Sequence, residues 1–134
     1  MSNIAIEAEF NDDPLKGIFW KISEVVGGNP ARRSYIKLHS SSHSIKNSLP
    51  GIVEYNWNEF IQTGSKDNHY ILFDFKDRKI DLSRYSLRTG PRPKGIDHLK
   101  SWKLEGSNDK ENFVLLDQRK NSQELNGSQN VYLS

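Results

Sequence analysis

The sequence contains no cysteine and no long run of apolar residues. Without cysteine no disulfide can form, which suits a reducing compartment, so we predict a cytoplasmic protein. No stretch approaches the roughly 18 apolar residues that a transmembrane helix needs, and we predict no transmembrane segment. The first residues, Met1 to Ile4, lack the basic and apolar regions of a secretory signal peptide. Together these absences exclude a disulfide-stapled secreted scaffold.

The sequence also has little excess of either charge, but its basic and acidic residues are unevenly distributed. The 134 residues carry a formal net charge of +2, so bulk charge does not favour nucleic acid as a partner. The stretch from Arg84 to Lys103 nevertheless contains six basic residues against one acid, Asp97. This stretch is therefore predicted to be locally cationic. A composition with 34% hydrophobic and 27% charged residues is typical of one soluble globular domain.

The most informative pattern lies between Ser101 and Leu116. Trp102 and Leu104 alternate with charged residues, which is the period of a strand with one buried face. Gly106 to Asp109 are turn-forming residues, and the chain becomes apolar again at Phe113 to Leu116. We therefore predict a β-hairpin in this stretch.

The remaining patterns predict mostly short strands. Apolar residues at three- and four-residue spacing predict one helix from Leu15 to Val26, ended by Gly27. The predicted strands are 34–38, 69–76 with both faces buried at its start, 85–89 and 131–133, whereas 39–47, 90–95 and 117–128 are predicted to be polar connections. Short strands with a single short N-terminal helix predict a mainly β fold, an antiparallel β-sandwich.

One family resemblance follows from the hairpin stretch. Lys100 to Asp109, with an aromatic residue at Phe113, resembles the signature hairpin of discoidin domains. These are also called coagulation factor 5/8 type C domains, and they belong to the galactose-binding-like superfamily. The match extends upstream through Asn56-Trp57-Asn58, Phe73-Asp74-Phe75 and Tyr85 to Thr89, so it covers roughly Leu15 to Gly127. It is most similar to the branch found in intracellular proteins, often beside BTB domains.

The resemblance implies an architecture. It narrows the sandwich to a jelly roll and predicts one discoidin-like domain over residues 1–134. Within it, a strand and helix segment (residues 1–28) would pack on the sandwich (residues 29–134). Members of the family continue with a final pair of strands, which this chain lacks, so we expect a C-terminally truncated or shortened domain. A protein partner is expected, including a linked BTB or other interaction domain in a longer protein.

The sequence also points to candidate binding residues in loops. Sandwich folds present variable loops at the ends of rigid strands, and the resemblance implies that several loops gather near one end. Guanidinium and ammonium groups there would bind a carboxylate, a phosphate or an acidic peptide, beside an aromatic surface. The alternative is a solvated surface that only maintains solubility. The candidate binding residues are Arg88, Arg92, Lys94, His98, His39, His43 and Trp57.

The sequence gives less support to a catalytic or metal-binding function than to a binding function. The sequence has no cysteine and no Gly-x-Ser-x-Gly elbow, and nothing in it places Ser40, Ser41 or Ser42 beside a histidine and an acid. We therefore do not predict an enzyme. No transition-metal site is predicted at His39 and His43, which fall in a serine-rich loop. Glu54, Asn56 and Asn58 are the candidates for a structural calcium ion, which is not expected, and no other cofactor is implied.

The leading hypothesis is a non-catalytic binding module that recognises a protein partner, or an anionic or sugar group, through loops at one end of a β-sandwich. The alternative is a carbohydrate-binding module, which would need an aromatic platform beside planar polar groups. A third reading is a binder of anionic lipid or nucleic acid through the basic 84–103 region, and of these nucleic acid is not favoured.

Overall fold

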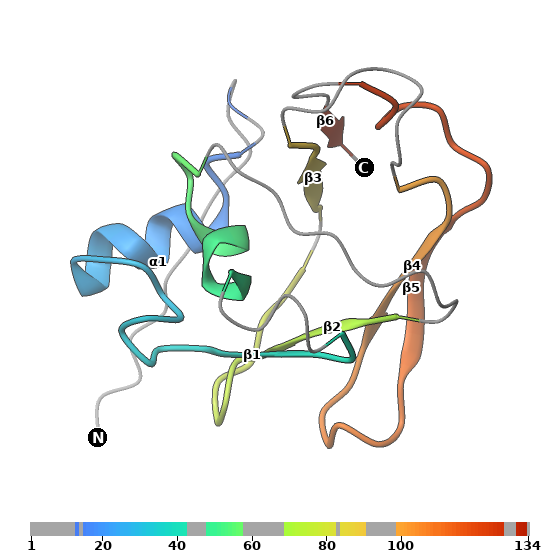
Figure 1. Ribbon diagram of the computed structural model, residues 1–134. Coiled ribbons are helices and arrows are strands. Elements are labelled where there is room, and N and C mark those ends of the chain that lie inside the picture. Colours follow the sequence, from blue (N-terminus) through green and yellow to red (C-terminus); the bar gives the residue numbers. More distant parts are fainter. Residues whose placement is uncertain are drawn as a thin grey trace. The chain divides into compact units, whose positions relative to one another are not determined.

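The computed structural model describes residue 13 and residues 15–42, 48–57, 69–82, 84–90, 99–127 and 131–133. These residues form six strands, one α-helix and one 3-10 helix, so a mainly β fold is confirmed in this part of the chain (Figure 1). In chain order the elements are α1 (Ile18–Val26), β1 (Lys37–Ser40), the 3-10 helix η2 (Leu49–Val53), β2 (Ile71–Asp74), β3 (Ser86–Arg88), β4 (Trp102–Gly106), β5 (Val114–Arg119) and β6 (Val131–Leu133).

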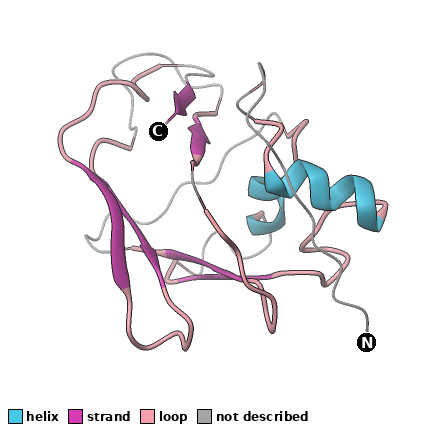
Figure 2. Ribbon diagram, turned by 180° about the vertical axis from the view of Figure 1, so that it is seen from behind, coloured by secondary structure: helices cyan, strands magenta, loops and turns pink. Residues whose placement is uncertain are grey.

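The described strands form three pairs. β1 and β2 pair antiparallel from Lys37 opposite Asp74 to Ser40 opposite Ile71. β4 and β5 also pair antiparallel, with an irregularity between Leu104 and Glu105, and β3 pairs with β6 (Figure 2). The chain divides between Ser86 and Leu87 into two compact units, the second of which ends at Tyr132. In the part of the chain that the structure describes, no helix has the length and apolar character to span a membrane.

Helix α1 confirms the predicted helix, but it begins three residues later than expected. The Asp13 side chain accepts a hydrogen bond from the backbone N–H of Leu15 at 3.0 Å, and its carbonyl accepts one from Lys16 at 3.1 Å. These bonds close a turn ahead of the helix, so helical geometry starts only at Ile18. At the other end Gly27 has φ 72°, and its N–H donates to the Ser23 carbonyl, as predicted for a left-handed cap.

Strand β1 differs from the predicted strand 34–38. Ser34 has φ 60°, and the backbone N–H of Tyr35 donates to the Pro30 carbonyl at 2.9 Å. These features belong to a turn, so the strand starts at Lys37. The prediction that a loop begins at His39 was therefore wrong, because His39 and Ser40 lie in the strand.

Strand β2 is shorter than the predicted strand 69–76. It ends at Asp74, whose side chain accepts a hydrogen bond from the Lys76 N–H at 2.8 Å, and Lys76 has φ 64°. This turn ends the ladder. The expectation of burial on both faces at the start of the strand was wrong at Tyr70, which is 59% exposed, whereas Ile71 and Leu72 are half-buried.

The hairpin predicted around Trp102 is confirmed as β4 and β5 (Figure 1). β5 continues through Asp117 to Arg119, so the predicted polar connection 117–128 starts three residues too early. The last predicted strand, 131–133, is β6. Tyr132 of β6 is buried, and the Trp102 indole meets its ring edge-on, with the ring centroids 5.1 Å apart. This aromatic pair packs the hairpin against β6 within the second unit.

The core of the first unit lies around η2. Ile22 of α1, Ile36 ahead of β1, and Leu49 and Val53 of η2 are buried. Phe19 of α1 stacks on Phe73 and Phe75, with ring centroids 5.4 and 5.9 Å apart.

Candidate functional site

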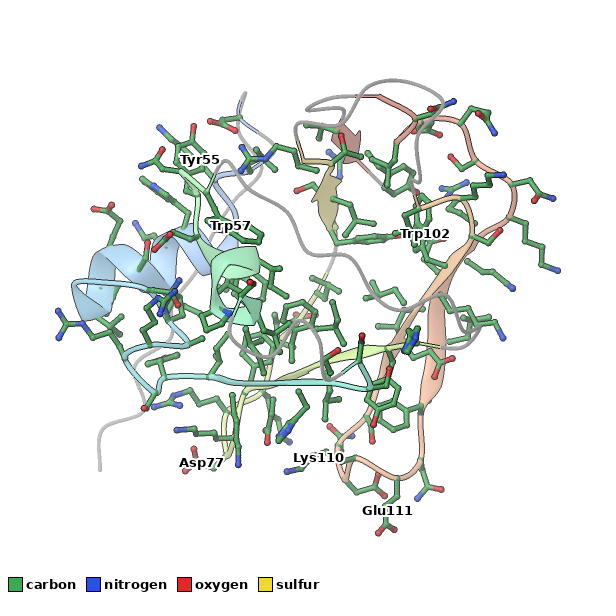
Figure 3. All side chains as sticks on the ribbon, in the orientation of Figure 1. Tyr55, Trp57, Asp77, Trp102, Lys110 and Glu111 are labelled. Carbon is green, nitrogen blue, oxygen red and sulfur yellow. The ribbon has the colours of Figure 1, made fainter. Side chains whose placement is uncertain are left out.

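The structure describes only some of the predicted binding residues. Arg88 lies half-buried in β3, His39 is exposed in β1, and Trp57 is half-buried after η2. The Trp57 indole lies against Gly51, so packing accounts for at least part of its role (Figure 3). Arg92, Lys94, His98 and His43 lie outside the described residues, as does most of the loop 90–98. The predicted loop site thus stays a prediction.

Two of the three calcium candidates, Glu54 and Asn56, line a pocket in which the described residues form no metal site. Glu54 and Asn56 are exposed in the connection after η2, and Asn58 lies outside the described residues. Among the residues described, no group of three histidine, aspartate or glutamate side chains is arranged to hold a metal ion. Glu54 and Asn56 instead line a pocket with aromatic walls.

This pocket, which we call the aromatic–polar pocket, has a volume of about 400 Å³. Two aromatic side chains, Trp20 of α1 and Tyr55, line it together with the acidic side chains of Glu24 and Glu54. The other lining residues are Ser23, Gly27, Gly28, Asn29, Pro30, Val53 and Asn56. The pocket is therefore built where the end of α1 meets the chain leaving η2.

Asn29 holds the two sides of the pocket together. Its side-chain oxygen accepts hydrogen bonds from the backbone N–H groups of Ala31 and Arg32, at 2.9 and 3.2 Å. Its side-chain nitrogen donates to the Pro50 carbonyl at 2.9 Å and to Glu54 Oε1 at 3.4 Å. Asn29 is thus a positioning residue, because the two bonds from its side-chain nitrogen tie the turn after α1 to η2 and to the Glu54 carboxylate, while the two bonds to its oxygen close the turn itself.

The two aromatic rings are also held in place. The Tyr55 hydroxyl donates a short hydrogen bond to Asp13 Oδ2 (Figure 3 labels Tyr55). The Lys16 ammonium lies 5.2 Å from the centroid of the Trp20 ring and 5.6 Å from that of Tyr55. Such cation–π contacts favour one orientation of each ring. The pocket is therefore lined by aromatic residues held in place by neighbouring groups, together with carboxylate and amide residues.

A second polar contact was not expected from the sequence. Ser41 Oγ lies 3.0 Å from His69 Nδ1, so the fold does place one of the three serines beside a histidine. Ser41 Oγ also accepts a hydrogen bond from the Tyr70 N–H at 2.8 Å, and the backbone N–H of Ser41 donates to the Tyr70 carbonyl. These bonds extend the β1–β2 ladder by one pair. Among the described residues the buried His69 Nε2 has no hydrogen-bond partner, so no acid orients the ring as in a catalytic triad.

The β4–β5 loop contains a strongly perturbed carboxylate. The Asp109 carboxylate accepts hydrogen bonds from the backbone N–H groups of Asn112 and Glu111, and from the side chains of Asn112 and Ser107. These bonds stabilise the charged form, so the pKa of Asp109 lies well below its ordinary value, with the Asn112 N–H as the largest cause. The group is fully exposed and orders the turn.

Comparison of the chain with protein-family models, with curated proteins and with solved structures finds no match. The residues of the aromatic–polar pocket were missed by sequence reasoning except for Glu54 and Asn56. The run Glu54 to Trp57, in which planar polar and aromatic residues alternate, was the available signal. Nothing in the sequence pairs this run with Trp20 and Asn29, which lie more than twenty residues away.

Proposed function

We propose that this chain is a non-catalytic binding module of discoidin type, with a jelly-roll sandwich that is truncated or shortened at its C-terminal end as its fold. The antiparallel hairpin with its packed Trp102, and the single helix ahead of the strands, support this proposal. The proposed module is cytoplasmic, because a chain without cysteine suits a reducing compartment. It uses no cofactor, and its single domain spans residues 1–134.

The proposed ligand is a sugar or a similar polyhydroxy group, bound in the aromatic–polar pocket. One observation carries this choice, namely that aromatic residues and planar polar residues line the same pocket. Aromatic faces pack on the apolar C–H faces of a sugar ring, while a carboxylate or an amide bonds its hydroxyl groups. A volume of about 400 Å³ is in the range of small-molecule sites.

Five of the residues that line the pocket have a role in this proposal. Trp20 and Tyr55 provide the packing surface, and Glu54 and Asn56 provide hydrogen-bonding groups from the exposed rim. Asn29 orients Glu54 and does not itself bind the ligand, since its polar atoms already bond the protein. Recognition of a protein partner is the second candidate, and it rests on a different surface, which is described below.

The test is a glycan array of mono- and disaccharides, followed by calorimetric titration of the best binder. We expect Glu54→Gln to weaken binding roughly tenfold, because a charge-assisted hydrogen bond is worth about 1.5–3 kcal/mol. Glu111→Gln is the matched control, since Glu111 is an exposed acid on the β4–β5 loop (Figure 3). Binding of no glycan, or equal binding by both variants, would refute the sugar site.

A further inference from the structure

A cationic surface forms at one end of the β1–β2 pair, outside the basic stretch noted in the sequence. Lys37 lies opposite Asp74 at the last position of the ladder, so the loop before β1 and the turn after β2 lie side by side there. Six basic side chains, all exposed, come from these two segments. They are Arg32, Arg33, Lys37, Lys76, Arg78 and Lys79.

Specific contacts fasten the two segments to each other. The Lys76 ammonium donates a short hydrogen bond to the Ser34 carbonyl. Arg78 Nη1 donates to the Tyr35 carbonyl at 2.9 Å, and its guanidinium carbon lies 3.8 Å from the centroid of the Tyr35 ring. The Lys76 and Arg78 side chains are therefore held against the loop before β1, which joins the two segments into one surface.

Two acids belong to the same segments, and neither reverses the local charge. Asp74 Oδ1 accepts the Lys76 backbone N–H, so this oxygen faces the turn. Asp77 lies exposed at the tip of the turn (Figure 3). Six cations against two acids leave this surface strongly positive, although the whole chain carries only +2.

An apolar-floored pocket of about 370 Å³ opens within this surface. Its rim includes the basic side chains of Lys37 and Lys76, together with Ser34. Its floor is aliphatic and consists of Ala31, Ile36, Leu38, Leu49 and Pro50. The volume is large enough to admit an apolar side chain such as leucine or phenylalanine, and the basic residues favour negative charges beside it.

We propose that this cationic surface binds an acidic peptide segment in which one apolar residue is flanked by carboxylates. The apolar residue enters the pocket, and the flanking carboxylates pair with Lys37 and its basic neighbours. Nucleic acid is disfavoured as the occupant because, among the residues that the structure describes, those that line the pocket include no aromatic ring for a base to stack on. The site shares no residue with the aromatic–polar pocket, so either proposal can fail alone.

The probes are fluorescent peptides with Leu, Ile or Phe between two pairs of glutamates, measured by fluorescence polarisation. Two analogues of the best binder test its two features, one with all glutamates changed to glutamine and one with the central residue changed to alanine. We expect each analogue to bind at least fivefold more weakly. Binding of the glutamate peptide is also expected to weaken as salt rises.

The protein variant is Lys37→Glu combined with Lys79→Glu, which reverses two exposed charges without touching the core. We expect it to bind the peptide roughly tenfold more weakly. The matched control is Lys100→Glu combined with Lys120→Glu, which makes the same change of charge on exposed residues of the second unit. This control is expected to retain most of the affinity, and thermal melts of both variants report whether the fold is intact.

Three results would overturn the proposal: no binding by any glutamate peptide, equal loss in the variant and its control, or equal binding by the alanine analogue. A single-stranded oligonucleotide and anionic vesicles complete the set of probes. Tighter binding of either one than of the peptide, lost in the Lys37 and Lys79 variant, would also overturn it and assign the surface to that ligand.

Discussion

Replacing Gly51 with alanine tests how the connection after η2 is held. An added Cβ at Gly51 would lie 2.5 Å from Trp57 Cδ2 and 2.7 Å from Trp57 Cζ2. Real Cβ contacts with ring carbons are ordinarily 3.4 Å or longer. Because several ring atoms overlap with the added Cβ at once, the indole has to move as a whole.

The expected cost follows from this overlap. Overpacking a well-filled site costs about 1–3 kcal/mol, which for a chain of this size lowers Tm by roughly 3–12 °C. Gly17→Ala is the matched control, since nothing lies within 4 Å of its added Cβ and its φ is −94°. That change is expected to alter the free energy of unfolding by only about 0.5 kcal/mol.

The assay is chemical and thermal unfolding followed by circular dichroism, with Trp57→Ala and the double variant completing a cycle. In the double variant the steric overlap is gone, so Gly51→Ala is expected to add little to the cost of Trp57→Ala. The reasoning fails if Gly51→Ala is as mild as Gly17→Ala. It also fails if the two changes simply add.

Two further predictions concern the second unit. Since the folded pKa of Asp109 lies below its ordinary value of 3.8, its contribution to stability is complete above about pH 5 and is lost as pH falls through 3.8 towards the folded pKa. The difference in unfolding free energy between wild type and Asp109→Ala should therefore shrink between pH 6 and pH 2.5, and a constant difference would contradict this. Tyr132→Phe removes a buried hydroxyl that accepts a hydrogen bond from Arg119 Nε at 2.6 Å, which should cost about 1–2 kcal/mol in urea unfolding. Tyr70→Phe, at an exposed ring, is its control. Equal free energies of unfolding in urea for wild type and Tyr132→Phe would show that the buried hydroxyl contributes nothing to stability.

Local patterns predicted the elements whose geometry is set locally. The alternation around Trp102 predicted the β4–β5 hairpin, and Gly27 predicted the end of α1. Both signals depend on residues within a few positions of each other. The limits of β1 and β2 were predicted less well because turns at Ser34 and Lys76, where φ is positive in non-glycine residues, are closed by specific hydrogen bonds. Propensity alone does not reveal those bonds.

The candidate sites also combine residues that the sequence indicated with residues that only the fold brings together. Glu54 and Asn56 were noticed from the sequence as oxygen donors, but the walls that surround them come from α1 and from the turn at Asn29. The cationic surface was missed because its lysines and arginines lie in two segments about 40 residues apart, each unremarkable by itself. Counting charge along the chain finds only clusters that are continuous in sequence.

The amino-acid sequence alone therefore determined the class of this protein as mainly β, the hairpin and the helix cap, because alternation and turn chemistry act between near neighbours. Tertiary structure decided which distant side chains share a pocket. It brought Trp20 to Tyr55, Ser41 to His69 and Lys37 to Lys76. Such pairings depend on which faces of the chain pack together and on the hydrogen bonds that close each turn, and no period in the sequence encodes them.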